Sequence, residues 1–331
     1  MRGAVSFWAG GGCSGTCTTT IAAATTVSAT FTLQQFPVTV TAACTGAGTV
    51  TSAPAGIDCG ATCTANCDLG TVVTLAAAPN AGSVFAGWSG AGCSGAGNCA
   101  FTVTGTTTIT ASYRGARVAI SAGATSCLRT AGNSGDRARI LIGNRGHVAT
   151  FVAATDIDTP AEIAAYDVIV IGGPGNPCAS IDASGYDGII DNYIRVSGGG
   201  VVASGWLLYN NLAAPNLYAD LPTVQNQNYL SGTQTITPVA GSPITTGVGT
   251  FTSGEWVPYG GGPKAGATSL LTVALNSVGA SWTVGSGRTV FLGPMFLENY
   301  ATYANEDLLD GTQPASIELF LRAVEWAAKA R

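Results

Sequence analysis

Charged residues are scarce in this chain of 331 residues: Asp, Glu, Lys and Arg together make up 9% of it, against about 25% in an average globular protein. The formal net charge is −5 and no cluster of Lys or Arg occurs, which argues against a nucleic-acid-binding groove. No apolar run reaches the roughly 18 residues that a membrane-spanning helix requires, so no membrane span is expected in this chain. The first residues also lack the apolar core of a secretory signal peptide.

Histidine occurs only once, at His147, whereas cysteine occurs ten times. Cys59, Cys63 and Cys67 are separated by three residues rather than the two typical of zinc sites, and the histidine is far away in sequence. Disulfides are therefore favoured over zinc, and no metal or cofactor is expected. The cysteines form three groups of even number, which predicts bridges within modules and an extracellular or bacterial cell-surface location. The groups are Cys13 and Cys17; Cys44, Cys59, Cys63, Cys67, Cys93 and Cys99; and Cys127 and Cys178.

The N-terminal third of the chain contains an internal repeat, because residues 83–113 repeat residues 5–31. The first copy corresponds to only the second half of a module, so we expect the natural N-terminus, with its signal peptide, to lie upstream of this chain. The matched positions lie at one constant offset and include Cys17 with Cys99, Val27 with Ile109, Ala29 with Ala111, and Phe31 with Tyr113.

The strands of this region are expected to be half-buried, because apolar and polar residues alternate with a period of two. In 38–42, valine and alanine occupy one face and threonine the other, and similar alternation recurs at 73–77, 101–103 and 109–113. Half-buried antiparallel sheets show this pattern. The resulting core is thin, so each disulfide is expected to contribute about 2–4 kcal/mol to stability.

Two consecutive motifs characterise the module. Residues 46–59 read GAGTVTSAPAGIDC, and residues 70–90 read GTVVTLAAAPNAGSVFAGWSG. Both resemble the divergent internalin-B-type bacterial repeat, with a complete copy over 32–113 and half a copy over 1–31. The resemblance implies an all-β secreted or surface stalk module without catalysis.

Within these modules we expect the cysteines to pair locally and the aromatic residues to anchor the core. Phe85 and Trp88 are expected to be buried, since large aromatic side chains mostly supply buried area. A glycan-stacking face made by these two rings is the alternative. The expected disulfides are Cys13–Cys17, Cys44–Cys67, Cys59–Cys63 and Cys93–Cys99.

After residue 114 the period-two pattern gives way to alternating strands and helices, which predicts a domain boundary near 114–117 and a parallel sheet flanked by helices. The run DVIVI at 167–171 is expected to be a fully buried strand. Ser184 and Asp187 have the spacing of a helix capping box. The expected strands lie at 117–121, 148–152, 167–171 and 201–203, and the expected helices at 134–145, from 184 and from 314.

This second region carries a resemblance of its own, over 116–331. Its segments resemble the class I glutamine amidotransferase-like fold, closest to the trehalose-utilisation-type branch. The resemblance implies an α/β flavodoxin-like three-layer sandwich with a mostly parallel sheet. The segments are RARILIGNRGH at 137–147, YDVIVIGG at 166–173, DNYIRVSGGGVVASGW at 191–206, SPITTGVGTF at 242–251 and GSGRTVFLGPMF at 285–296.

The positions that carry the family's chemistry hold other residues in this chain. The resemblance places a nucleophilic Cys in an elbow after the strand at 201–203, where this chain has Ser204, with the elbow apex at Gly205 or Trp206. It places a His after a later strand, where this chain has Gly293 and Pro294. We therefore expect no catalytic residues and no amidotransferase activity.

The remaining reactive side chains do not fill these roles. His147 precedes the second strand of the sheet, opposite the edge where sites of such sheets lie, so we expect it to be structural. Cys127 and Cys178 fall in loops after different strands and are expected to form a disulfide.

The carboxyl ends of the parallel strands are the expected place for a ligand site. Aromatic and amide side chains there would suit a sugar. The candidate residues for this pocket are Asn176, Ser204, Trp206, Tyr209, Asn210 and Glu298.

The expected function is adhesion, binding or extracellular scaffolding by a non-catalytic protein. Its expected partner is a cell-surface glycan, a protein or a second copy of the chain. Two alternatives stay open. One is an extracellular hydrolase that acts on glycans or peptides through Ser204 or the region of Glu298. The other is a self-assembling fibre subunit whose repeats stack through exposed edge strands.

Overall fold

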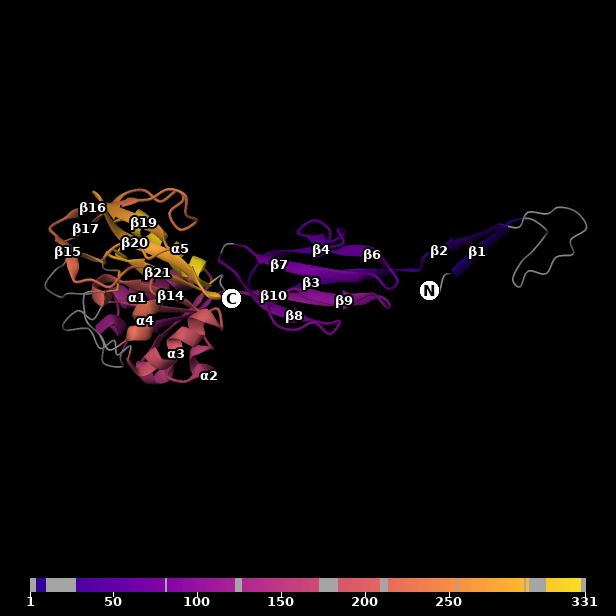
Figure 1. Cartoon of the computed structure of the whole chain (residues 1–331), viewed down its shortest axis with the longest axis horizontal. Helices are drawn as coiled ribbons and strands as arrows, with labels where there is room; N and C mark the ends of the chain where they lie inside the picture. Colours follow the sequence, from indigo (N-terminus) through magenta and orange to yellow (C-terminus); the bar gives the residue numbers. More distant parts are fainter. Residues whose placement is uncertain are drawn as a thin grey trace, which may run out of the picture. The chain divides into compact units, whose positions relative to one another are not determined.

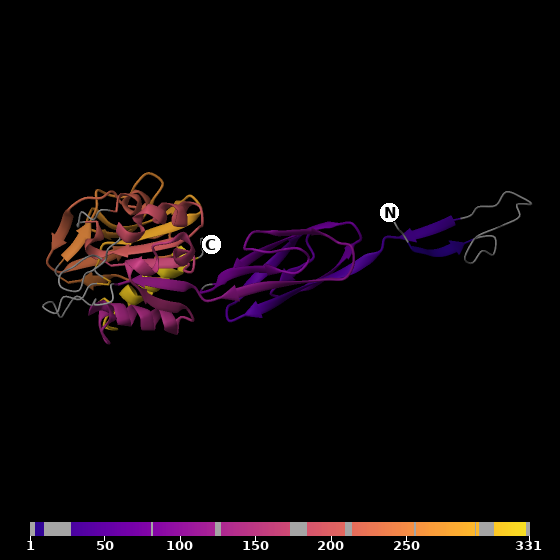
Figure 2. The same cartoon turned by 90° about the horizontal axis from the view of Figure 1, so that it is seen from below.

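The computed structural model describes residues 4–9, 28–80, 82–122, 127–172, 184–208, 214–254, 256–294, 296–297 and 308–328. The chain divides into two compact units, the first made of Met1–Pro79 and Phe85–Tyr113 and the second of Asn80–Val84 and Arg114–Arg331. Figures 1 and 2 show one unit built from strands and another that mixes helices with strands. A short turn of the repeat, Asn80–Val84, thus groups with the second unit.

The complete repeat is made of two four-stranded sheets, ordered β6-β3-β10-β8 and β5-β4-β7-β9. Most pairs are antiparallel, as the sequence predicts, but β3 and β10 run parallel. These two strands lie far apart in the chain, which leaves room for the long connection that a parallel pair needs. The strands are β3 (Gln35–Cys44), β4 (Gly48–Ala53), β5 (Asp58–Cys59), β6 (Thr64–Asp68), β7 (Val72–Pro79), β8 (Val84–Ser89), β9 (Cys99–Thr102) and β10 (Thr107–Arg114). Upstream, β1 (Ala4–Ala9) and β2 (Ser28–Thr32) form an antiparallel pair.

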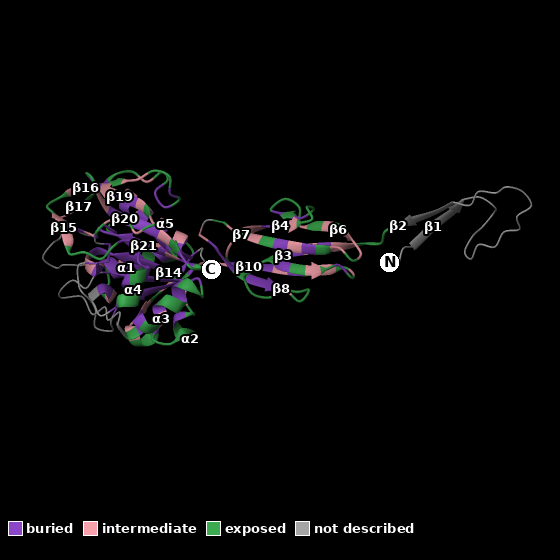
Figure 3. Cartoon of the chain, in the orientation of Figure 1, coloured by how far each residue is buried: buried purple, intermediate pink, exposed green. Residues whose placement is uncertain are grey.

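The core of the repeat follows the period-two pattern. Val38, Val73 and Ile109 are at most 1% exposed, while their threonine neighbours turn outward, and Figure 3 shows this alternation along the strands. Phe85 and Trp88 are 6% and 5% exposed, with ring centroids 4.9 Å apart. The Trp88 indole N–H donates a hydrogen bond to the Gly97 carbonyl at 2.7 Å. The prediction of buried core anchors is confirmed, and the glycan-stacking alternative is wrong for these two rings.

Two of the expected disulfides are present, Cys59–Cys63 and Cys93–Cys99. The expected Cys44–Cys67 bridge is wrong, because Cys67 is a free thiol that lies opposite Phe36, near the start of β3. Cys44 ends the same strand, and eight residues at about 3.3 Å each put roughly 26 Å between the two positions, whereas a bridge needs Cα atoms within about 7 Å. Cys13, Cys17 and Cys178 lie outside the described residues, and only the backbone of Cys127 is described.

The two disulfides and the free thiol of the repeat predict which cysteine reacts in the unreduced protein. Cys67 is half-buried and lines a surface cleft with Ser52, Pro54 and Asn66, so iodoacetamide should label it without denaturant. Peptide mass mapping should find no label on the four bridged cysteines of the repeat until a reductant is added. A Cys67→Ser variant is the control for site assignment. A disulfide-linked peptide that joins Cys67 to Cys44 would contradict the strand register.

The second unit contains a nine-stranded mixed sheet with the order β12-β11-β13-β14-β21-β20-β19-β16-β17. The first five strands are parallel, and every pair from β21 onward is antiparallel. The strands are β11 (Arg117–Ser121), β12 (Val148–Val152), β13 (Val168–Ile171), β14 (Gly200–Ser204), β16 (Gln234–Pro238), β17 (Phe251–Ser253), β19 (Thr268–Val273), β20 (Asn276–Val284) and β21 (Gly287–Leu292). A separate ribbon pairs β15 (Asn228–Ser231) with β18 (Trp256–Tyr259).

The expectation of a mostly parallel sheet is therefore wrong for this unit. Only two residues separate β19 from β20 and β20 from β21. Connections this short can join only antiparallel neighbours, whereas parallel strands need a crossover. Within the antiparallel half, β19, β20 and β21 form a meander, and β16 and β17 extend the sheet beyond β19, an order that the sequence patterns above do not predict.

Five α-helices accompany the sheet in the described part of this unit. They are α1 (Ser134–Asn144), α2 (Pro160–Ile163), α3 (Ser184–Arg195), α4 (Pro215–Asp220) and α5 (Pro314–Ala328). α1 ends one residue before its expected end, and α3 and α5 begin where expected. The Asp187 carboxylate, however, accepts the backbone N–H groups of Asn216 and Leu217. It therefore caps the first turn of α4, whereas the side chain of Ser184 lies outside the described residues.

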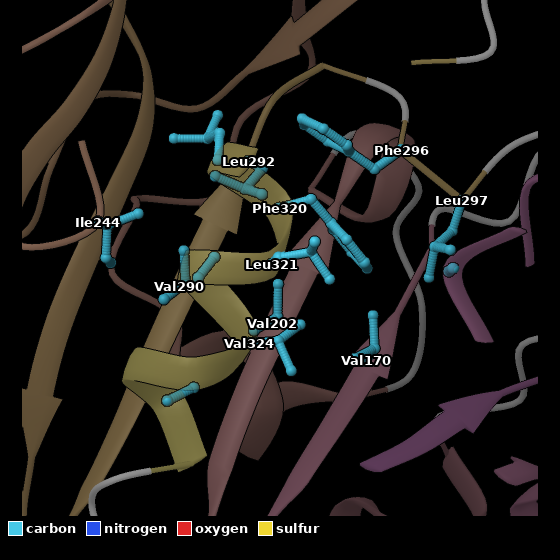
Figure 4. Close-up of a cluster of buried hydrophobic side chains, with 14 of the residues drawn as sticks. Val170, Val202, Ile244, Val290, Leu292, Phe296, Leu297, Phe320, Leu321 and Val324 are labelled. Atoms are coloured by element: carbon cyan, nitrogen blue, oxygen red, sulfur yellow. The ribbon is translucent and has the colours of Figure 1, made fainter. Parts of the chain in front are cut away.

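Helices cover both faces of the parallel strands, because alternate residues of each strand enter different buried clusters. In β13, Val168 and Val170 join the cluster that contains α1 and α5, while Ile169 and Ile171 join the cluster that contains α3. Figure 4 shows Phe320, Leu321 and Val324 of α5 close to the side chains of the strands. Burial on both faces explains why the DVIVI run is apolar throughout.

One buried ion pair ties the start of the second unit to its sheet. Asp167, immediately before β13, is fully buried and accepts hydrogen bonds from Arg114 Nη2 and from the backbone N–H of Arg117, both at 2.8 Å. Burial by itself would raise the pKa of Asp167, but these hydrogen bonds outweigh it and hold the pKa below its usual value. The carboxylate is therefore ionised and holds β11 beside β13.

Candidate functional site

The predicted pocket lies where β14 ends, but the structure describes only two of its six residues. Ser204 is the last residue of β14, and Trp206 lies in the 3₁₀ turn η3 (Gly205–Leu207) that follows. Asn176, Tyr209, Asn210 and Glu298 lie outside the described residues. The described part of the expected site is thus the carboxyl end of β14.

The turn after β14 offers no nucleophile at its apex. Gly205 has φ +63°, in the left-handed region that favours glycine, whereas Ser204 before it is extended. The Ser204 side chain is 1% exposed, and its hydroxyl has no hydrogen-bond partner within the part of the chain that the structure describes. The apex is Gly205, so the residue that the turn presents has no side chain.

Gly293, the residue that follows the neighbouring strand β21, has no room for a side chain. A Cβ atom added at Gly293 would lie 2.4 Å from the Pro258 carbonyl oxygen and 2.5 Å from that of Val278. Backbone atoms at this distance exclude any side chain. An imidazole could not be placed at 293 without moving β18 or β20, and residue 294 is proline.

The single histidine lies at the other edge of the sheet, just before β12 begins. His147 is 6% exposed, and its Nδ1 accepts the backbone N–H of Ala116 at 3.0 Å. Because Nδ1 is an acceptor, the neutral ring carries its proton on Nε2, which lies 3.5 Å from Glu325 Oε1. His147 thus takes part in the packing around β11 and α5 and does not face the carboxyl end of β14.

An aromatic cluster that the sequence analysis missed lies beside this end of β14. The rings of Trp206, Tyr229 and Trp256 have centroids 5.8 Å (Trp206–Tyr229), 6.3 Å (Trp206–Trp256) and 5.0 Å (Tyr229–Trp256) apart. The three residues come from η3, β15 and β18, and β15 pairs with β18 so that Tyr229 and Trp256 are diagonal neighbours. The only signal in the sequence was the presence of aromatic residues in two short β-rich segments.

The ribbon that carries these rings has one inner and one outer face. Val257 is fully buried in the core, and Leu230 opposite it packs against that core. Tyr229, one residue away from Leu230, is 44% exposed, and Trp206 and Trp256 are partly exposed. The inner residues fasten the ribbon to the sheet, while the rings on the outer face remain partly accessible.

The segment that carries the cluster contains few charged residues. From 206 to 262 the chain contains two charged residues, Asp220 and Glu255, and Glu255 lies outside the described residues. Asp220 is fully buried and its Oδ1 accepts a hydrogen bond from Arg195 Nε at 2.8 Å. Burial raises the pKa of Asp220 in spite of that hydrogen bond. The exposed polar residues that precede Tyr229 are instead amides, at 225–227.

No metal site or membrane helix is found in the described part of the chain. Within it, no group of three or more His, Cys, Asp or Glu side chains is arranged to hold a metal ion. Among the described helices, none combines the length and apolar character needed to cross a membrane.

Comparison with known proteins supports the repeat and gives distant neighbours for the fold. Residues 36–117 match the family model of the divergent InlB B-repeat domain, which confirms the resemblance predicted for this segment. No curated protein matches the chain. A cytoplasmic protein from Salmonella typhimurium is similar in structure, with 13% identity, a TM-score of 0.44, and coverage of 64% of this chain and 98% of that chain.

Two further neighbours carry more specific descriptions. A ThuA-like protein from Bacteroides uniformis has 13% identity and a TM-score of 0.43 over 64% of this chain and 90% of its own. A glutamine amidotransferase from Thermotoga maritima has 10% identity and a TM-score of 0.33 over 54% of this chain and 74% of its own. ThuA-like and amidotransferase-like proteins are thus among the structural neighbours of this multidomain chain.

Proposed function

We propose that this chain is a secreted or cell-surface bacterial protein in which β-repeats carry an amidotransferase-like head that binds a partner and does not catalyse. The parallel half of the head sheet supports a flavodoxin-like arrangement, because its strands in chain order are placed 2-1-3-4-5. Two local disulfides in a small β-module support an oxidising compartment.

The observation that carries the proposal is the glycine at the apex of the turn after β14. Amide transfer from glutamine needs a nucleophile, a base and an oxyanion hole in one place. Gly205 has no side chain to act as a nucleophile, and the close backbone contacts of Gly293 exclude a basic side chain at that position after β21. His147 lies at the opposite edge of the sheet. The head therefore keeps the framework of such a site without its reactive groups.

The hydrolase alternative through Ser204 is disfavoured by the surroundings of its hydroxyl. A serine nucleophile needs a hydrogen-bonded base to take its proton, and the described residues provide no partner for Ser204 Oγ. A role for Glu298 in hydrolysis, and the fibre alternative, stay predictions. Electron microscopy of the purified full chain tests the fibre.

We expect no release of ammonia from glutamine above background when the full chain is assayed at millimolar substrate. Loss of the nucleophile or base of a catalytic unit typically lowers the rate by several powers of ten, and the two positions that would hold them are Gly205 and Gly293 in this chain. Ser204→Ala and His147→Ala should leave the background unchanged, and the latter should lower the melting temperature. A glutaminase rate that disappears in either variant would show that the elbow is assigned wrongly.

A further inference from the structure

We propose that Trp206, Tyr229 and Trp256 form a binding site for an uncharged oligosaccharide at the carboxyl end of β14. This inference rests on the proposed function, since it names the class of partner that a non-catalytic head would bind. The three rings belong to separate segments and meet only in the folded protein, with centroids 5.0–6.3 Å apart.

The ribbon presents the rings rather than burying them. Tyr229 is 44% exposed, although an inward-facing position one residue away is packed against the core. Trp206 and Trp256 are partly exposed on the same side. Aromatic side chains combine an apolar face with a polar edge and lose little conformational entropy on binding. They suit the C–H face of a pyranose, which is apolar and rimmed by hydroxyl groups.

The lack of basic residues in the segment that carries the rings favours an uncharged partner. The segment from 206 to 262 contains no Lys or Arg at all, so a phosphate or a sulfated glycan would find no cation in it. Its one described acidic residue, Asp220, is buried and paired with Arg195. A quaternary ammonium ligand would also place its cation over these rings, but the described neighbours of the cluster offer it no exposed carboxylate.

The polar residues that directly precede Tyr229 in the chain have side chains whose chemistry matches sugar hydroxyls. Gln225, Asn226 and Gln227 are exposed and Asn228 is half-buried, and the four amides directly precede Tyr229 in the chain. Each amide provides both donors and acceptors, and each sugar hydroxyl does the same. Such a site would bind a sugar by stacking the rings on its apolar face and by hydrogen bonds from the amides to its hydroxyl groups. Neither interaction requires a charged side chain.

The test is titration of the full chain with maltohexaose, cellohexaose and chitohexaose, followed by calorimetry and tryptophan fluorescence. We expect at least one hexaose to bind with a dissociation constant below about 1 mM, unchanged between low and high salt. Tyr229→Ala and Trp256→Ala should each weaken binding at least about tenfold, the effect of losing one good contact. Tyr229→Phe, which keeps the ring, should stay within about threefold of wild type.

The controls separate loss of the site from loss of the fold. Leu275→Ala removes another exposed apolar side chain, from the tip of the β19–β20 hairpin, and should change neither binding nor melting temperature. Tyr229→Ala should also keep the wild-type melting temperature, since its ring is largely outside the core. Choline and a heparin hexasaccharide are the charged probes, and we expect neither to bind.

Three results would overturn the proposal: no binding of any neutral hexaose at about 5 mM, binding of choline or heparin instead, or hexaose affinity unaffected by both alanine variants. Chromatography of the hexaose after incubation tests the proposed function separately. Shortened products would show an enzyme and reject the proposed function. Absence of both binding and products would reject only this site.

Discussion

Replacement of Asp167 by alanine is expected to lower the free energy of unfolding of the second unit by about 3–5 kcal/mol, the usual cost of removing one partner from a buried ion pair. Asp167 is fully buried and receives hydrogen bonds from the Arg114 side chain and the Arg117 backbone. Without the carboxylate, the partly buried Arg114 guanidinium and the Arg117 backbone N–H lose their shared acceptor. The change also removes a link between the ends of β11 and β13.

Urea unfolding of the full chain, followed by circular dichroism at 222 nm, measures this effect on the second unit, because the described helices all lie there. Asp191→Ala is the matched control, since Asp191 pairs with Arg195 on the surface, where its side chain is 52% exposed. Exposed pairs contribute at most about 1 kcal/mol. An Asp167→Ala variant no less stable than Asp191→Ala would refute the assigned role of the buried pair.

Asp167 and Asp220, which are both fully buried, are also expected to respond oppositely to pH. The pKa of Asp167 is lowered in the folded protein, so its stabilising effect is full above the unfolded value of about 3.9 and is lost as the pH falls through the lower folded value. The pKa of Asp220 is raised, so its contribution is full at low pH and is lost as the pH rises through the folded value. Asp167→Asn should therefore cost more stability at pH 7 than Asp220→Asn, and unfolding measured from pH 2 to 8 tests this order.

Replacement of Phe320 by alanine is the second change with a large expected effect, a loss of about 3–5 kcal/mol in the free energy of unfolding. Phe320 is fully buried on α5 and stacks on Phe296, with ring centroids 5.6 Å apart and planes inclined by 18°. Figure 4 shows both rings among the side chains of the same cluster, with Val202 and Val290 nearby. Alanine would leave a cavity between the last helix and the sheet.

Phe320→Leu is the matched variant, because it keeps most of the apolar volume and should cost less than about 1.5 kcal/mol. The same urea titration measures both variants. If Phe320→Ala were as stable as Phe320→Leu, α5 would not be packed on the sheet as described. An unchanged oligosaccharide affinity in Phe320→Leu would further separate the core from the proposed binding site.

Local patterns in the sequence were sufficient for much of the secondary structure. The alternation predicted the buried residues at 109–113 and at 38–40 but was wrong at Ala42, which is exposed, and the DVIVI run predicted a strand buried on both faces. Helix positions at 134 and 314 were predicted within a residue of their actual starts. Periodicity succeeds here because one residue's burial depends on which face of its own strand or helix it occupies.

Pairing between distant segments could not be predicted in the same way. Cys59–Cys63 and Cys93–Cys99 were predictable because each bridge closes within a few residues. Cys44–Cys67 failed because its partners are separated by a strand register that no local pattern reveals. For the same reason the antiparallel half of the sheet was missed, since its order depends on which strands meet in space.

The amino-acid sequence by itself determined the two-part organisation, the repeat, and the absence of Cys and His from the positions where the amidotransferase resemblance expects them, because each is a property of residues close together in the chain. Only the tertiary structure decided that Gly205 is the apex of the turn, since a positive φ is a property of the folded backbone. It alone also brought Trp206, Tyr229 and Trp256 together. Three rings from separate segments become a cluster only when the β15–β18 ribbon packs on the sheet, and that packing is a long-range effect of burying Val257 and its neighbours.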